Sequence, residues 1–330
     1  MLVGRFGESL DRPTCERTSR REFLAASLAG SVCLAGPLNL AGSWNLAAAG
    51  PAASARRTDE HLLHQVGITT SSLAGHVASK PTAGKFTLQQ LPAVLRDELG
   101  ISVIDLNTST IAGLNRRDLE QARAAADRAG AIFTNLKLNQ RGPDLASDDE
   151  TIARRAMDTY KRSIDDAAIL GCRWVRVLPT VQRPDVARYA AALQSLASYC
   201  RQHEIELLIE NYGWLEDDPA SVPKLMQAVG GNVAACPDTG NWANNQTRYA
   251  GLKATFPLAA SCDFKAAALG PEGEHTAYDL RRCFELGWQA GFRGPWCLEH
   301  GNRDRKALFR ELALLRGLLN DWMKEAQRSS

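Results

Sequence analysis

Short apolar runs alternate with longer amphipathic stretches from residue 65 to the end of the chain. The runs are bounded by turn residues and are mostly rich in Val, Ile and Leu, which is typical of strands that are buried on both faces. This pattern predicts eight strands, over residues 65–70, 102–106, 131–138, 174–178, 206–209, 232–236, 259–265 and 296–299.

The stretches between these runs carry apolar residues at helical spacing. Thr87, with Gln90 three residues later, indicates a capping box that begins the first helix. Gly100, Gly130 and Gly171 follow three of the stretches, at the position where a glycine commonly ends a helix. We predict helices over residues 87–99, 117–129, 152–170, 186–203, 222–229, 249–256, 277–290 and 306–326.

Eight strand-helix units predict an α/β fold, a single (β/α)8 TIM barrel over residues 60–330. Each crossover is long enough for a helix, so the strands should run parallel. An open doubly wound sheet is the alternative. It is disfavoured because residues 67–70, after the first strand, lack the glycines of a dinucleotide-binding turn.

Residues 1–55 have the pattern of a leader. The segment 19–24, Ser-Arg-Arg-Glu-Phe-Leu, precedes a weakly apolar run and resembles a twin-arginine export signal. Small residues at 47–49 and 53–55 offer cleavage sites. The alternative is a basic start to an Ala-rich surface helix. The signal predicts an exported or periplasmic protein that keeps no stable membrane anchor after cleavage, because Val32 before Cys33 does not suit lipid attachment.

The composition and charge of the chain exclude several classes of function. Of the 330 residues, 45% are hydrophobic and the net charge is +2, so the chain is globular and does not suit a nucleic-acid binder. No apolar run reaches the roughly 20 residues that cross a membrane. Six cysteines follow the leader without a C-x-x-C pair, and we expect buried free thiols rather than disulfides or a zinc cluster. Assembly into a homo-oligomer remains an open alternative to a monomer.

Carboxylates close the last four predicted strands, at Glu210, Asp238, Asp263 and Glu299. In a barrel these strand ends converge on one mouth, where active sites lie. Buried carboxylates are costly unless they are paired or bound to a metal. An all-oxygen set suits Mn²⁺, Mg²⁺ or a similar hard ion better than zinc. The alternative for each single carboxylate is that it caps the following helix.

Four motifs occur in a specific order: Ile-Glu-Asn at 209–211, Pro-Asp-Thr-Gly-Asn at 237–241, Asp-Phe-Lys at 263–265, and Gly-Phe-Arg-Gly at 291–294 before Leu-Glu at 298–299. With them the chain resembles the xylose isomerase-like barrel family, the sugar phosphate isomerases and epimerases. That resemblance implies a divalent metal ion held by Glu, Asp, His and Glu on successive strands. Here Asp263 stands at the histidine position.

The resemblance also implies an activity on a small carbohydrate. Glu210 and Glu299 match the pair that moves a proton next to a metal-polarised carbonyl, and Lys265 would add positive charge near the developing oxyanion or pair with Asp263. Export favours a free or oxidised sugar, or a glycoside, over a sugar phosphate. A lyase or hydrolase acting on keto-sugars or glycosides, and a non-catalytic sugar-binding barrel, remain alternatives.

Five further residues are candidates for substrate binding. Amides, an indole and a charged group near strand ends can hold sugar hydroxyls or stack on the ring. Each also has a structural alternative, which is loop packing, a solvated loop position for the histidine, or pairing with a neighbouring carboxylate for the arginine. The candidates are Asn211, Asn241, Trp242, Arg176 and His300.

Overall fold

The computed structural model describes residues 60–140, 142, 144–267, 269–270 and 273–329. The twin-arginine segment and the proposed cleavage sites lie outside the described residues. Within the described part of the chain, no helix combines the length and the apolar character that a membrane-spanning segment needs.

Eight parallel strands form one curled sheet, in the order β8-β7-β6-β5-β4-β1-β10-β9. All eight predicted strands are present, with ends within a few residues of the prediction. They are β1 (Val66–Thr69), β4 (Val103–Asn107), β5 (Ile132–Leu138), β6 (Trp174–Val177), β7 (Glu206–Ile209), β8 (Val233–Ala235), β9 (Cys262–Lys265) and β10 (Trp296–Glu299).

The two end strands of this order, β8 and β9, meet and close the barrel. Parallel bridges join Ala235 to Ala259 and Asp238 to Asp263. The Asp263 backbone is held on both sides, because its N–H donates to Pro237 O at 2.9 Å and its carbonyl accepts from Thr239 N at 2.9 Å. The predicted (β/α)8 barrel is therefore confirmed, and its seam brings two of the predicted metal ligands together.

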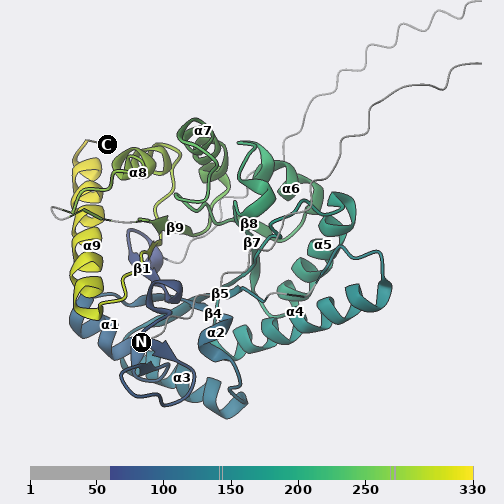
Figure 1. Ribbon diagram of the computed structural model, residues 1–330, viewed down its shortest axis with the longest axis horizontal. Helices are drawn as coiled ribbons and strands as arrows, with labels where there is room; N and C mark the ends of the chain where they lie inside the picture. Colours follow the sequence, from purple (N-terminus) through teal and green to yellow (C-terminus); the bar gives the residue numbers. More distant parts are fainter. Residues whose placement is uncertain (1–59, 141, 143, 268, 271–272, 330) are drawn as a thin grey trace, which may run out of the picture. The chain divides into compact units, whose positions relative to one another are not determined.

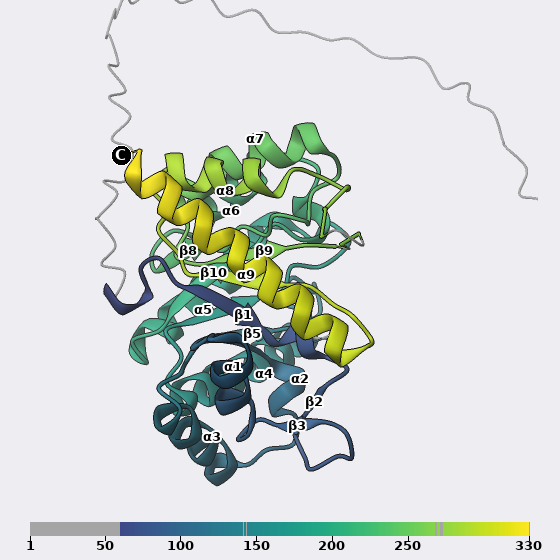
Figure 2. The same cartoon turned by 90° about the vertical axis from the view of Figure 1, so that its left-hand side faces the viewer.

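Helices surround the strands (Figure 1), and α9 lies against β1 and β10 (Figure 2). Asp or Asn side chains cap several helix N-termini, for example Asp185 before α5 and Asp304 before α9. The helices are α1 (Leu91–Leu99), α2 (Thr108–Ile111), α3 (Arg116–Arg128), α4 (Glu150–Leu170), α5 (Val186–Gln202), α6 (Ser221–Val229), α7 (Asn245–Thr255), α8 (Leu280–Gln289) and α9 (Arg305–Arg328), with short 3-10 turns at Glu60–Leu62, Thr70–Leu73, Gly213–Leu215 and Phe256–Leu258.

The start predicted for the first helix is wrong by four residues. Thr87 belongs to a two-residue strand, β3 (Phe86–Thr87), which pairs with β2 (Val77–Ala78). Gln90 still accepts from Thr87 N at 3.0 Å, as in half of a capping box, but this contact closes a turn before α1 begins at Leu91. Pairing with a segment nine residues upstream outweighs the local capping signal.

Two apolar layers hold the barrel together. The larger one fills the space between strands and helices, and a smaller inner cluster includes Val103, Trp174, Leu208 and Cys297. Burial of this surface is the main favourable contribution to folding. The six cysteines after the leader are buried free thiols, as predicted: Cys172, Cys200, Cys236, Cys262, Cys283 and Cys297.

Candidate active site

The barrel interior changes from apolar to charged along the strands. Leu208 on β7 and Cys297 on β10 belong to the inner apolar cluster. Side chains two positions apart on a strand share a face, so Glu210 and Glu299 continue the same interior rows toward the carboxyl ends of the strands. The predicted acid/base pair therefore lies at the mouth of the barrel, in line with its inner core.

Glu210 follows β7 and is almost fully buried. Its Oε2 lies 2.5 Å from Arg176 Nε, as an ion pair whose atoms are not aligned for a hydrogen bond, and its Oε1 accepts from Asn241 Nδ2 at 2.9 Å. Arg176 also donates to Asn139 Oδ1 at 2.6 Å. Burial raises the pKa of Glu210, although the charge of Arg176 opposes that shift. Arg176 therefore takes the carboxylate-pairing role left open by the sequence.

Asp238 is held in a tight loop beyond β8. Its Oδ1 accepts from the backbone N–H groups of Gly240 at 2.6 Å and Asn241 at 3.0 Å. The Asn211 side chain holds this loop in place through two hydrogen bonds. Its Oδ1 accepts from Asp238 N at 2.8 Å, and its Nδ2 donates to Asp238 O at 2.9 Å. Burial raises the pKa of Asp238 well above its ordinary value, against the charge of Lys265. Asn211 is itself fully buried and therefore positions Asp238.

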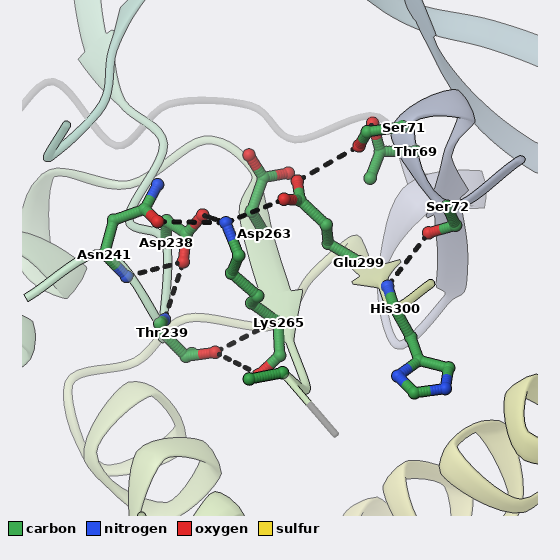
Figure 3. Close-up of polar contacts among 12 residues, drawn as sticks. Thr69, Ser71, Ser72, Asp238, Thr239, Asn241, Asp263, Lys265, Glu299 and His300 are labelled. Atoms are coloured by element: carbon green, nitrogen blue, oxygen red, sulfur yellow. Dashed lines mark hydrogen bonds and ion pairs between the residues drawn. The ribbon is translucent and has the colours of Figure 1, made fainter. Parts of the chain in front are cut away.

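Lys265, at the end of β9, lies at the centre of the mouth (Figure 3). Its Nζ is 2.8 Å from Glu299 Oε1, 2.9 Å from Asn241 Oδ1 and 3.5 Å from Asp238 Oδ2. Burial acts to lower the pKa of Lys265, but Asp238 and Glu299 outweigh it and raise the pKa. The Lys265 ammonium thus stays charged beside the carboxylates, and its ion-pair partners are Asp238 and Glu299 rather than Asp263, the partner in the structural alternative.

Glu299 is the more accessible of the two predicted catalytic glutamates, with 21% of its side chain exposed. Besides its ion pair with Lys265, its Oε2 accepts from Ser71 Oγ at 3.2 Å (Figure 3). Burial acts to raise the pKa of Glu299, but Lys137 and Lys265 outweigh it and hold the pKa below its usual range. The pKa of Glu210 is therefore raised and that of Glu299 lowered, which is the difference expected of an acid and a base that share one site.

Asp263 forms an ion pair with a residue that sequence reasoning missed. Lys137 on β5 contacts Asp263 Oδ1, and both side chains are fully buried. Asp105 on β4 accepts from Thr134 Oγ1 at 2.7 Å, and burial raises its pKa. A signal for Lys137 is present in the sequence, because Lys137, like Arg176, is a charged residue within an apolar strand.

The donor set at the mouth fits a hard divalent cation. Glu210, Asp238 and Asp263 each offer an oxygen, and these three atoms lie within 4.8 Å of one another. Asp263 Oδ2 is buried and has no hydrogen-bond partner among the described residues. An unpartnered buried carboxylate oxygen is costly, and a cation would satisfy it. These three residues, which we call the buried acidic triad, are three of the four predicted metal ligands.

Two predicted substrate-binding residues lie away from the carboxylates. The His300 ring points away from them (Figure 3), with Nδ1 2.9 Å from Ala266 O and Nε2 2.8 Å from Glu311 Oε2. Trp242 is buried in the outer core, where its ring packs so closely on Gly251 that a Cβ there would clash. The structure therefore assigns His300 to anchoring α9 and Trp242 to packing against α7.

Comparison with known proteins agrees with this architecture. The model of the xylose isomerase-like TIM barrel family matches residues 97–324. The sequence has no significant match among curated proteins.

Solved structures with the same fold include a xylose isomerase-like TIM barrel protein from Mycobacterium smegmatis in complex with magnesium, with a TM-score of 0.60, 17% identity, and coverage of 81% of this chain and 98% of that one. A structure of L-ribulose 3-epimerase has a TM-score of 0.63, 16% identity, and coverage of 81% and 97%. D-psicose 3-epimerase, solved in the presence of D-fructose, has a TM-score of 0.59, 15% identity, and coverage of 81% and 98%. Together with the family match, these likenesses establish the fold: the chain belongs to the xylose isomerase-like TIM barrel family.

Proposed function

We propose that this protein is a sugar isomerase or epimerase that moves a proton at the carbon next to a carbonyl. One observation carries the proposal: Asn241 and Lys265 link the two predicted catalytic glutamates into one site. Asn241 donates to Glu210 and accepts from Lys265, and Lys265 pairs with Glu299. Two carboxylates from different strands, joined by a cation, are what proton removal and return at a carbon next to a carbonyl require.

Each side chain has a part in this chemistry. Glu299, whose pKa is held low, is ionised and suits the base, and Glu210, whose pKa is raised by burial, suits the acid. Lys265 brings positive charge to the place where the substrate oxygen becomes negative. In the reverse direction the two glutamates exchange roles.

A divalent metal belongs to the proposal. Glu210, Asp238, Asp263 and Glu299 would hold it, and a bound ion would polarise the carbonyl oxygen of the sugar. The buried acidic triad supports this assignment, as does magnesium in the Mycobacterium smegmatis structure.

The substrate class follows from the site and its relatives. Acidic, amide and lysine groups suit a neutral, hydroxyl-rich molecule, and the similar structures include epimerases named for L-ribulose and D-psicose. We therefore assign a small free sugar or keto-sugar. A lyase would begin with the same proton removal, and product analysis separates it from an epimerase.

The same proposal places the enzyme outside the cytoplasm. The supporting observation is the twin-arginine pattern at 19–24, followed by a weakly apolar segment and small residues. A protein exported by this route is commonly folded before it crosses the membrane. Phosphorylated sugars are mainly cytoplasmic, which favours an unphosphorylated substrate.

The direct test is exchange of solvent deuterium into the sugar. Purified protein with added Mn²⁺ is incubated in D2O with D-fructose or L-ribulose, and proton NMR follows the carbons next to the carbonyl. Wild type should label one of these carbons and form an epimer or isomer, whereas Glu210→Gln and Glu299→Gln should not. Wild type that neither labels nor converts any ketose or aldose of a broad panel would point to the non-catalytic sugar-binding alternative.

A further inference from the structure

Lys137 is a fully buried ammonium in the middle of the molecule. It lies on β5, and its carboxylate contact is Asp263 Oδ1 on β9. The ammonium and the carboxylate form an ion pair in which both side chains are fully buried. A buried charge is tolerated only when it is paired, and Asp263 supplies the opposite charge.

Only one of the two carboxylate oxygens of Asp263 takes part in this ion pair. Oδ1 contacts Lys137, while Oδ2 is buried and without a hydrogen-bond partner among the described residues. The backbone of Asp263 is fixed on both sides at the barrel seam, by Pro237 O and Thr239 N. Asp263 also belongs to the triad with Glu210 and Asp238. A rigid carboxylate thus keeps one oxygen free within an acidic cluster.

The negative charge of the site explains why Asp263 is paired with a lysine. Asp263 stands where the resemblance implies a histidine, which is neutral when it binds a metal. An aspartate there adds one negative charge to a buried site that already contains Glu210, Asp238 and Glu299. Lys137 removes that excess, and the Lys137–Asp263 pair is neutral overall.

We propose that Lys137 is a positioning residue: it neutralises Asp263 through Oδ1 and leaves Oδ2 as a metal donor, so that the pair replaces a neutral histidine ligand. The inference rests on the metal-dependent function proposed above. The contrary view is that Lys137–Asp263 is an ordinary buried ion pair and that Asp263 does not bind the metal.

Four variants separate these views: Lys137→Met, Asp263→Asn, and the doubles Lys137→Met/Asp263→Asn and Lys137→Met/Asp263→His. Two quantities are measured on each, the melting temperature of the metal-free protein and the dissociation constant for Mn²⁺ by electron paramagnetic resonance. Lys224→Met/Asp218→Asn is the matched control, because it removes an exposed Lys–Asp pair with Nζ–Oδ2 at 2.8 Å. It should leave both quantities unchanged.

Each single variant leaves one buried charge unpaired, so both should melt earlier than wild type, and the Met/Asn double should recover most of the loss. That recovery is expected on either view. The Mn²⁺ affinity decides between them. We expect the Met/Asn double to bind Mn²⁺ at least about tenfold more weakly than wild type, and the Met/His double to regain most of the affinity.

Three outcomes would overturn the inference in different ways. If the Met/Asn double binds Mn²⁺ as tightly as wild type, Asp263 is not a ligand, and the inference fails while the metal-dependent function stands. If wild type binds no Mn²⁺, the metal-dependent function fails together with it. A Met/His double that folds but binds no better than the Met/Asn double would also contradict the proposed equivalence to histidine.

Discussion

Lys265 and Glu299 are direct neighbours across the adjacent strands β9 and β10, and their side chains meet at the barrel mouth with Nζ 2.8 Å from Oε1. Because the strand register sets this pair, the carboxylate that we propose as the base and the cation beside it come from rigid elements rather than from loops. The pair also explains why the pKa of Glu299 is held below its usual range, although burial acts in the opposite direction. Glu299 is therefore available as a base at neutral pH.

Replacing Lys265 with Met should lower the rate and shift its pH dependence. The substitution removes the charge beside the reacting oxygen, and we expect kcat to fall by about a hundredfold. It also removes one of the three charges, with those of Lys137 and Arg176, that lower the pKa of Glu299, so this pKa rises and the acidic limb of the rate profile moves to higher pH. Rate profiles in deuterium exchange measure both effects. An unshifted acidic limb would show that Glu299 is not the base.

Gly240 makes room for Lys265. A Cβ at this position would lie 2.5 Å from Lys265 Cδ and 3.0 Å from the Tyr278 hydroxyl. Gly240→Ala should therefore displace the lysine and lower kcat by about tenfold or more, with a stability loss of about 1–3 kcal/mol from overpacking. Gly301→Ala is the control, because a Cβ there meets nothing within 4 Å. Equal activities of the two variants would show that the position of Lys265 does not matter.

Sequence patterns predicted the barrel well because its strands are buried on both faces and its turns carry clear signals. They also predicted Glu210, Asp238, Asp263 and Glu299, since parallel strands present their carboxyl ends at one mouth. They did not predict which ammonium pairs with which carboxylate. Lys137 and Asp263 are 126 residues apart in the chain, and only the closed barrel brings them into contact.

The placements of His300 and Trp242 depend on tertiary contacts that the sequence hides. Oε2 of Glu311 on α9 lies 2.8 Å from Nε2 of the His300 ring. Gly251 has no Cβ, which leaves space for the ring of Trp242. Glu311 lies 11 residues after His300, and Gly251 lies nine residues after Trp242, each within the helix that follows. A position after a strand end does not by itself indicate whether a side chain turns toward the mouth or toward that helix.

The Arg176–Glu210 ion pair should contribute strongly to stability. Both side chains are almost fully buried, so Arg176→Met leaves a buried carboxylate without its counter-charge and should cost about 3–5 kcal/mol of unfolding free energy. Adding Glu210→Gln should recover much of this loss, because the amide carries no charge. Urea unfolding of the single and double variants in metal-free buffer measures the coupling. Additive losses would indicate that the pair is not coupled.

Buried thiols should be unreactive in the folded protein. The six cysteines after the leader are buried, and burial raises the pKa of Cys200 and of Cys283 to about 12, so little thiolate forms at neutral pH. Protein without residues 1–55 should react slowly with dithionitrobenzoate when folded and yield six thiols in guanidinium chloride. Fewer than six thiols would reveal disulfides formed after export.

Export should depend on the arginine pair that precedes the barrel. Lys at both Arg20 and Arg21 keeps the positive charge of the leader but removes the guanidinium groups, which lysine does not replace where their geometry is read. In a bacterial host with a twin-arginine pathway, wild type should lose its leader and appear in the periplasmic fraction, whereas the double variant should stay full-length in the cytoplasm. Arg56→Lys, beyond the predicted cleavage sites, is the matched control and should be exported normally. Equal export of both variants would contradict the twin-arginine assignment and would reopen the case for a phosphorylated, cytoplasmic substrate.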